Sequence, residues 1–111
     1  MADSSRRDRA AGAIMCAFSG DAIGLGPHGY YDRAELRRDY GEWITGYTDP
    51  RPGRYHAGLK AGQSSQAGFI LELTLRSLVA YGQSAEADFC RRLDEEMLPP
   101  LAGAPSRGRG R

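Results

Sequence analysis

The chain has 111 residues, a formal net charge of +1 and two cysteines. This length suits one small domain with a modest core, and the near balance of charge excludes a global field that would recruit nucleic acid or an anionic membrane. Cys16 and Cys90 are far apart, and neither a secretory signal nor a membrane span is visible. The sequence therefore predicts a cytoplasmic protein that contacts neither membrane nor nucleic acid.

The first predicted helix starts at Arg9, because residues 1–8 are polar and are expected to be disordered. Apolar side chains then recur every three or four residues, which puts Asp21 on the same face as Ile14 and Phe18. A carboxylate on an apolar face needs partners. Asp21 is expected either to accept amide hydrogens from the turn that follows it or to take a direct part in a site.

The turn Gly24-Leu25-Gly26-Pro27-His28-Gly29 ends this helix, since glycine permits left-handed backbone geometry and a helix does not continue through proline. Such a turn can also bring bare amides to a phosphate, although most Gly-Pro turns are only turns. His28 is either a loop residue facing solvent or a residue of a site.

The second predicted helix begins at Asp32, with Glu35 three residues later as in a loose capping box. Its apolar face consists of Leu36, Tyr40, Trp43 and Ile44. The helix is expected to end near Gly46. Residues 47–63 contain prolines and glycines without a sustained period, and a loop of this length in a small domain is usually functional or mobile.

Aromatic rings gather around this loop, together with arginines and a second histidine: Tyr30, Tyr31, Tyr40, Trp43, Tyr47, Tyr55, Arg51, Arg54 and His56. Flat rings and guanidinium groups suit a ligand with a flat base and a phosphate, through stacking and paired hydrogen bonds. In that case Arg54 and Tyr55 would contact the ligand. The alternative is that the tyrosines simply hold the loop against the helices.

The central helix follows Gly62-Gln63-Ser64-Ser65-Gln66-Ala67-Gly68, where Ser64 or Ser65 can cap it. Residues 69–79 are apolar except for a narrow stripe that carries Glu72 and Arg76. The pattern predicts a helix that is buried on all but this stripe. Its N-terminus, with free amides and the positive end of the helix dipole, favours an anion.

A fourth helix is predicted after Ser84, which can cap it, and it is expected to stop at Pro99-Pro100. Residues 99–111, rich in proline, glycine and arginine, are expected to be a disordered tail. Period-two alternation is absent, so the predicted fold class is all-α with about four helices.

Residues 9–14, read together with Gly20-Asp21-Ala22-Ile23-Gly24, resemble the opening signature of the ADP-ribosylglycohydrolase family. The segment from Gly62 to Leu78 falls where that family carries a Gly-rich lead-in, a Thr-Asp-Asp-Thr motif and an apolar helix. The resemblance covers Arg9 to Met97. It implies an all-helical fold and hydrolysis of the glycosidic bond that joins ADP-ribose to a protein side chain, with paired magnesium ions.

This sequence departs from the family motif at the metal ligands. Ser65 stands at the first threonine, Gln66 and Ala67 stand at the two aspartates, and Gly68 stands at the last threonine. Magnesium prefers hard, anionic oxygen ligands, which an amide and a methyl group do not supply. His28, where many members place a glutamate, is also a ligand that magnesium disfavours. No cofactor is therefore expected in this chain, although the family uses magnesium.

Family members are substantially longer and carry further metal-binding aspartates near their C-terminal end. We therefore expect the domain, residues 9–98, to be the N-terminal portion of such a fold. A helix as apolar as the central one would then lack packing partners, which predicts exposed apolar surface and low stability.

Two functions follow as hypotheses. In the first, the chain is a family member impaired in hydrolysis, with Ser65, Gln66 and His28 lining the remnant of the pocket and Asp21 bracing it. In the second, it is a non-catalytic module that binds ADP-ribose or a nucleotide phosphate without metal. The expected partner is ADP-ribose or an ADP-ribosylated protein. Histidine chemistry at His28 without metal and RNA binding by the tail are weaker alternatives.

Overall fold

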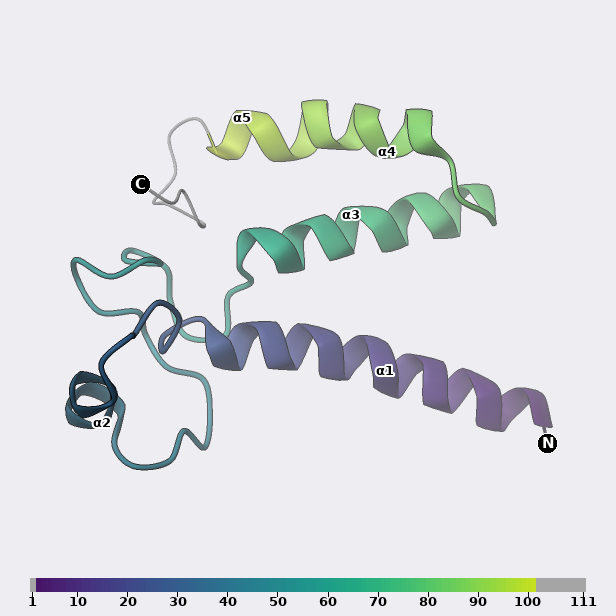
Figure 1. Cartoon of the computed structure of the whole chain (residues 1–111). Coiled ribbons are helices and arrows are strands. Elements are labelled where there is room, and N and C mark those ends of the chain that lie inside the picture. Colours follow the sequence, from purple (N-terminus) through teal and green to yellow (C-terminus); the bar gives the residue numbers. More distant parts are fainter. Residues whose placement is uncertain (1, 102–111) are drawn as a thin grey trace.

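The computed structural model describes residues 2–101, which form helices and loops and contain no strand (Figure 1). The helices are α1 (Ala2–Gly24), α2 (Arg33–Tyr40), α3 (Gln66–Tyr81), α4 (Glu86–Arg92), the π-helix η1 (Leu93–Met97) and α5 (Leu98–Leu101). The last three follow one another without a break, so the described chain has four helical segments. The predicted all-α class is confirmed.

The helix α3 lies between α1 on one side and the run from α4 to α5 on the other (Figure 1). The helix α2 and the long loop of residues 41–65 gather at the end where α1 stops and α3 starts. The molecule measures 46 × 39 × 19 Å. The helix α1 and the run from α4 to α5 both contact α3 and do not contact each other. These three helical segments thus form a single layer (Figure 1). None of them is long and apolar enough to cross a membrane.

The core is small because α3 has helical neighbours on two sides only. The buried apolar residues are Ala22, Leu25, Leu59, Leu73 and Met97. On α3 the buried residues are Gly68, Leu73 and Ser77, whereas Val79 is 86% exposed. The prediction that α3 is buried on all but one stripe is therefore wrong. The expected exposed apolar surface is present, on Ile14 and Met15 as well as on α3.

The helix α1 begins seven residues earlier than its periodicity predicts. Residues 2–8, expected to be disordered, are helical. An ion pair joins Arg7 to Asp3 one turn before it, at 3.1 Å, and a helix that is already nucleated extends by a residue at little cost. Met1 lies outside the described residues.

The helix α2 starts as predicted and ends early. The carboxylate of Asp32 caps it by accepting a hydrogen bond from the amide of Ala34 at 2.8 Å. Gly41 then adopts a φ of 82° and donates its amide to the carbonyl of Arg37, so the helix ends at Tyr40, six residues before Gly46. Trp43, placed on its apolar face by the periodicity, lies beyond the helix and is 81% exposed.

The last helical run also differs from expectation at both ends. Ala85 is the N-cap residue of α4 and no side chain caps it, so Ser84 lies one residue too early to do so. The two prolines do not stop the run: both lie within α5, which follows η1 directly and reaches Leu101. The predicted end of this helix at Pro99-Pro100 is therefore wrong. Residues 102–111 of the predicted tail lie outside the described residues.

Candidate functional site

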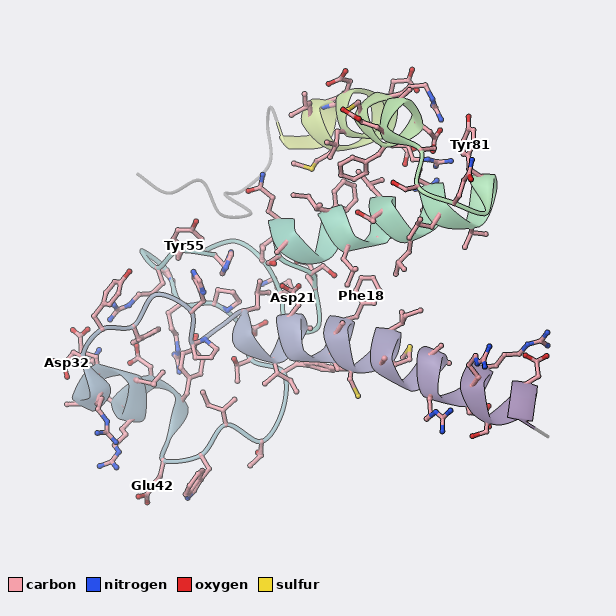
Figure 2. All side chains as sticks on the ribbon, turned by 45° about the vertical axis from the view of Figure 1, so that its right-hand side comes forward. Phe18, Asp21, Asp32, Glu42, Tyr55 and Tyr81 are labelled. Atoms are coloured by element: carbon pink, nitrogen blue, oxygen red, sulfur yellow. The ribbon has the colours of Figure 1, made fainter. Side chains whose placement is uncertain are left out.

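Two segments that are far apart in the sequence meet where α1 ends and α3 begins. Asp21, in the last turn of α1, faces α3 (Figure 2) and accepts two hydrogen bonds from Ser65. The amide of Ser65 donates to Oδ2 of Asp21 at 2.8 Å, and the hydroxyl of Ser65 donates to Oδ1. The partner of Asp21 is therefore the start of α3, and the turn that directly follows Asp21 does not supply it.

Of the two serines predicted as possible caps of α3, Ser65 is the one that caps it. Its Oγ accepts hydrogen bonds from the amides of Ala67 and Gly68, at 3.1 and 3.4 Å. The carboxylate of Asp21 thus occupies the place at the N-terminus of α3 where the helix dipole favours an anion. The expected anion is present, but it is a side chain of the protein itself. A phosphate at this point would be repelled by that carboxylate.

A cavity of about 500 Å³ opens beside this junction. It brings together four residues that the sequence singled out for a site, Asp21, His28, Ser65 and Gln66, and also Tyr55 from the long loop. The remaining lining residues are Gly20, Gly24, Leu25, His56, Ala67 and Ile70. The walls therefore come from α1, the turn after it, the loop and the first turns of α3.

Three rings pack against one another on the loop side of this cavity. The ring centroids of His28 and Tyr55 are 4.7 Å apart, those of His28 and His56 are 5.0 Å apart, and those of Tyr55 and His56 are 4.7 Å apart. His28 is exposed and lines the cavity, so it is both a loop residue and a residue of the candidate site. The ring planes are inclined to one another by 55°, 48° and 88° respectively, so the cluster offers both ring faces and ring edges on this side of the cavity.

His56, which the sequence placed among the rings around the loop but not among the candidate pocket residues, lines the cavity. It is only 4% exposed, and its Nδ1 is enclosed without a hydrogen-bond partner. Burial, followed by the neighbouring His28, lowers the pKa of His56 below its ordinary value of 6.5. Burial and the neighbouring His28 therefore favour the neutral form of His56.

Arg54 does not line the cavity. Its guanidinium donates to Glu35 at 3.0 Å and lies 4.0 Å from the centre of the Tyr30 ring, and the hydrogen bond to Glu35 raises its pKa. Tyr30 in turn donates to Asp39 at 2.6 Å. Arg54 therefore holds the loop against α2, and Tyr30 holds the segment before α2 against it. Tyr55, next to Arg54 in the loop, lines the cavity.

The side chains around the cavity do not fit a magnesium ion. Among the described residues that line it, Asp21 is the one carboxylate, and both of its oxygens already accept hydrogen bonds from Ser65. The other polar side chains are a hydroxyl, a primary amide, a phenol and two imidazoles, whereas magnesium requires mainly anionic oxygen. Within residues 2–101 no three His, Cys, Asp or Glu side chains are grouped so that they could hold a metal ion.

Comparison with known proteins places this site in context. The family model described as ADP-ribosylglycohydrolase matches residues 2–110, which is nearly the whole chain. No curated protein and no solved structure matches the chain. The family match agrees with the helical fold. The chain therefore belongs to the ADP-ribosylglycohydrolase family.

Proposed function

We propose that the cavity between α1 and α3 is the site at which this family member takes an ADP-ribose-type ligand, and that the chain is impaired in hydrolysing the glycosidic bond. The observation that carries the proposal is the cavity itself. Its volume of about 500 Å³ lies within the range of about 300–1,000 Å³ typical of small-molecule sites. It is also lined by Asp21, His28, Ser65 and Gln66 together.

The side chains of this cavity supply groups that suit a sugar and a flat ring. Each oxygen of Asp21 uses one acceptor position for Ser65, which leaves two of about four positions free to accept from hydroxyl groups. Gln66 offers one carbonyl and two amide hydrogens. The rings of His28, Tyr55 and His56 offer faces and edges for stacking.

Impaired hydrolysis follows from the residues at the metal motif. Ser65, Gln66, Ala67 and Gly68 contribute no carboxylate, and the carboxylate of Asp21 is held by Ser65. The family reaction relies on magnesium, and this cavity lacks the anionic oxygens that would hold it. We therefore expect the family's ligand to bind without efficient cleavage.

The direct test is release of ADP-ribose from an ADP-ribosylated protein, measured with millimolar magnesium and with chelator. We expect rates close to that of a buffer blank in both conditions. Magnesium-dependent turnover that disappears in a folded Ser65→Ala variant would overturn the proposal of impaired hydrolysis.

A second candidate function is that the chain binds its ligand and catalyses no reaction, and the ring cluster favours it. Calorimetry with ADP-ribose in the presence of chelator tests this function. Binding should weaken in His28→Ala, whose ring lines the cavity. The matched control is Arg54→Ala, because Arg54 pairs with Glu35 outside the cavity. Absence of heat at millimolar ADP-ribose, or a larger loss in Arg54→Ala than in His28→Ala, would contradict binding at this cavity.

A further inference from the structure

The residues at the junction of α1 and α3 do more than fail to hold a metal. They connect the two helices directly. The amide and hydroxyl of Ser65 both donate to Asp21, and Oγ of Ser65 also accepts from the first amides of α3. Ser65 is therefore at once the cap of one helix and the partner of a carboxylate from the other.

We propose that the Asp21–Ser65 pair is a metal-free clamp, which joins α1 to α3 and forms the cavity without any divalent cation. The proposal concerns how the cavity is built, so it does not depend on which ligand the cavity takes.

The negative charge of Asp21 at the junction is partly offset without a cation. The carboxylate of Asp21 lies at the N-terminus of the 16-residue helix α3, where the helix dipole is equivalent to about half a positive charge. It also receives an N–H and an O–H group from Ser65. These interactions stabilise the charge of the partly buried carboxylate without a bound metal ion.

Space at the junction is also filled. A Cβ atom built on Gly68 would overlap Oδ2 of Asp21 and lie 3.1 Å from its Cγ and 3.0 Å from Cβ of Ser64. The first turn of α3 thus packs directly onto the carboxylate. An ion with its own shell of oxygen ligands at about 2.1 Å could enter on this side only if α1 and α3 moved apart.

Thermal unfolding of the full chain, followed by circular dichroism, tests the clamp. We expect the same Tm with chelator and with millimolar magnesium. A rise of Tm on addition of magnesium that chelator reverses would overturn the proposal, because it would mean that the folded chain holds the cation.

A double-mutant cycle tests the pair itself. Asp21→Asn and Ser65→Ala should each lower Tm, and the double variant should lower it by no more than the larger single effect, since either change alone breaks the clamp. Ser65→Thr, which keeps a hydroxyl, should lower Tm much less than Ser65→Ala. Ser64→Ala is the control and should leave Tm nearly unchanged. Additive losses, or a loss in Ser64→Ala equal to that in Ser65→Ala, would contradict the clamp.

Should a cycle variant fail to fold, the magnesium titration of the unmodified chain still decides the proposal. The outcome is also separable from the proposed function. A chain with a magnesium-dependent Tm that still binds ADP-ribose in chelator would refute the clamp alone. A chain with a magnesium-independent Tm and no ADP-ribose binding would refute the ligand alone.

Discussion

The α-carbon of Gly68, in the first turn of α3, packs so closely on the carboxylate of Asp21 in α1 that no side chain fits between them. This contact explains why a glycine, the weakest ordinary helix former apart from proline, occupies a buried helical position. The helix thus contains a residue of low helix propensity at this position, and the absence of a side chain there allows α1 and α3 to pack closely.

Replacement of Gly68 by alanine should therefore destabilise the chain although alanine is the better helix former. The added methyl group meets Oδ2 of Asp21, and overpacking of this kind costs about 1–3 kcal/mol. Chemical denaturation measures the effect. Gly12→Ala is the matched control, because a Cβ there meets nothing within 4 Å and should stabilise α1 by up to about 1 kcal/mol. Stabilisation by both changes would mean that the Asp21 contact is not made.

The sequence identified the residues of this junction as candidates for a site, but it did not predict the hydrogen bonds between them. A serine before an apolar run is a local signal, and it predicted the cap of α3 correctly. The hydrogen bonds between Ser65 and Asp21 join residues 44 positions apart, and no local pattern encodes such a pairing. The meeting of the two segments was instead implied by the family resemblance of both.

His56 shows where the composition of the loop did not separate residues of the site from their neighbours. It lies in the loop of residues 41–65, which has no period, and its burial results from the packing of that loop against the turn that carries His28. Arg54 stands two residues earlier in the same loop but is directed to Glu35. Neighbouring loop residues can therefore face opposite surroundings, and composition alone does not separate them.

The lowered pKa of His56 should make the fold less stable in mild acid. Because the folded-state pKa is below the ordinary value of 6.5, the unfolded chain binds the proton first, and stability is lost as the pH falls below 6.5. Urea denaturation between about pH 5 and pH 8 measures the free energy of unfolding as a function of pH. The slope of that dependence should flatten in His56→Gln, because glutamine does not titrate.

His28→Gln is the matched comparison for that experiment. The His28 charge is the second cause of the lowered pKa of His56, after burial. His28→Gln should therefore reduce the slope without abolishing it. An unchanged slope in His56→Gln would show that another group is responsible for the acid sensitivity.

The small core makes single core residues unusually important. Leu73 is fully buried at 0% exposure and is one of two fully enclosed large side chains among the described residues. Leu73→Ala should cost about 2–5 kcal/mol, a large part of the roughly 5–15 kcal/mol of a typical domain. Val79→Ala on the same helix should change stability by less than about 0.5 kcal/mol, since Val79 is 86% exposed. Equal effects in thermal unfolding would contradict the packing of α3.

The apolar periodicity of α3 identified the helix but not its buried face. Leu73 and Val79 look equally suitable for a core in the sequence, yet only one of them is covered. The difference arises because α3 and its two helical neighbours form one layer, and burial then depends on which side of α3 faces α1 or α4. Periodicity predicts which residues share a face, and it contains no information about how many faces are covered.

Asp88 provides the final prediction, which concerns acid stability between α3 and α4. Its side chain is 2% exposed and accepts hydrogen bonds from Arg92 and Arg91, each at 2.7 Å. The hydrogen bond from Arg92, followed by those from Ser77 and Arg91, holds the pKa of Asp88 well below its usual range. Its contribution to stability is therefore present above the unfolded-state pKa of about 3.9 and is lost as the pH falls further.

Asp88→Asn should lower Tm at pH 7, and the gap to the unmodified chain should close as the pH falls below about 3.9. Thermal unfolding across that range measures the gap. Asp94→Asn is the control, because Asp94 is exposed on the same helical run and should shift Tm little at any pH. A Tm difference that stays constant with pH would contradict the prediction. It would mean that the fold does not lower the pKa of Asp88, because the two chains would then differ in packing and not in the ionisation of residue 88.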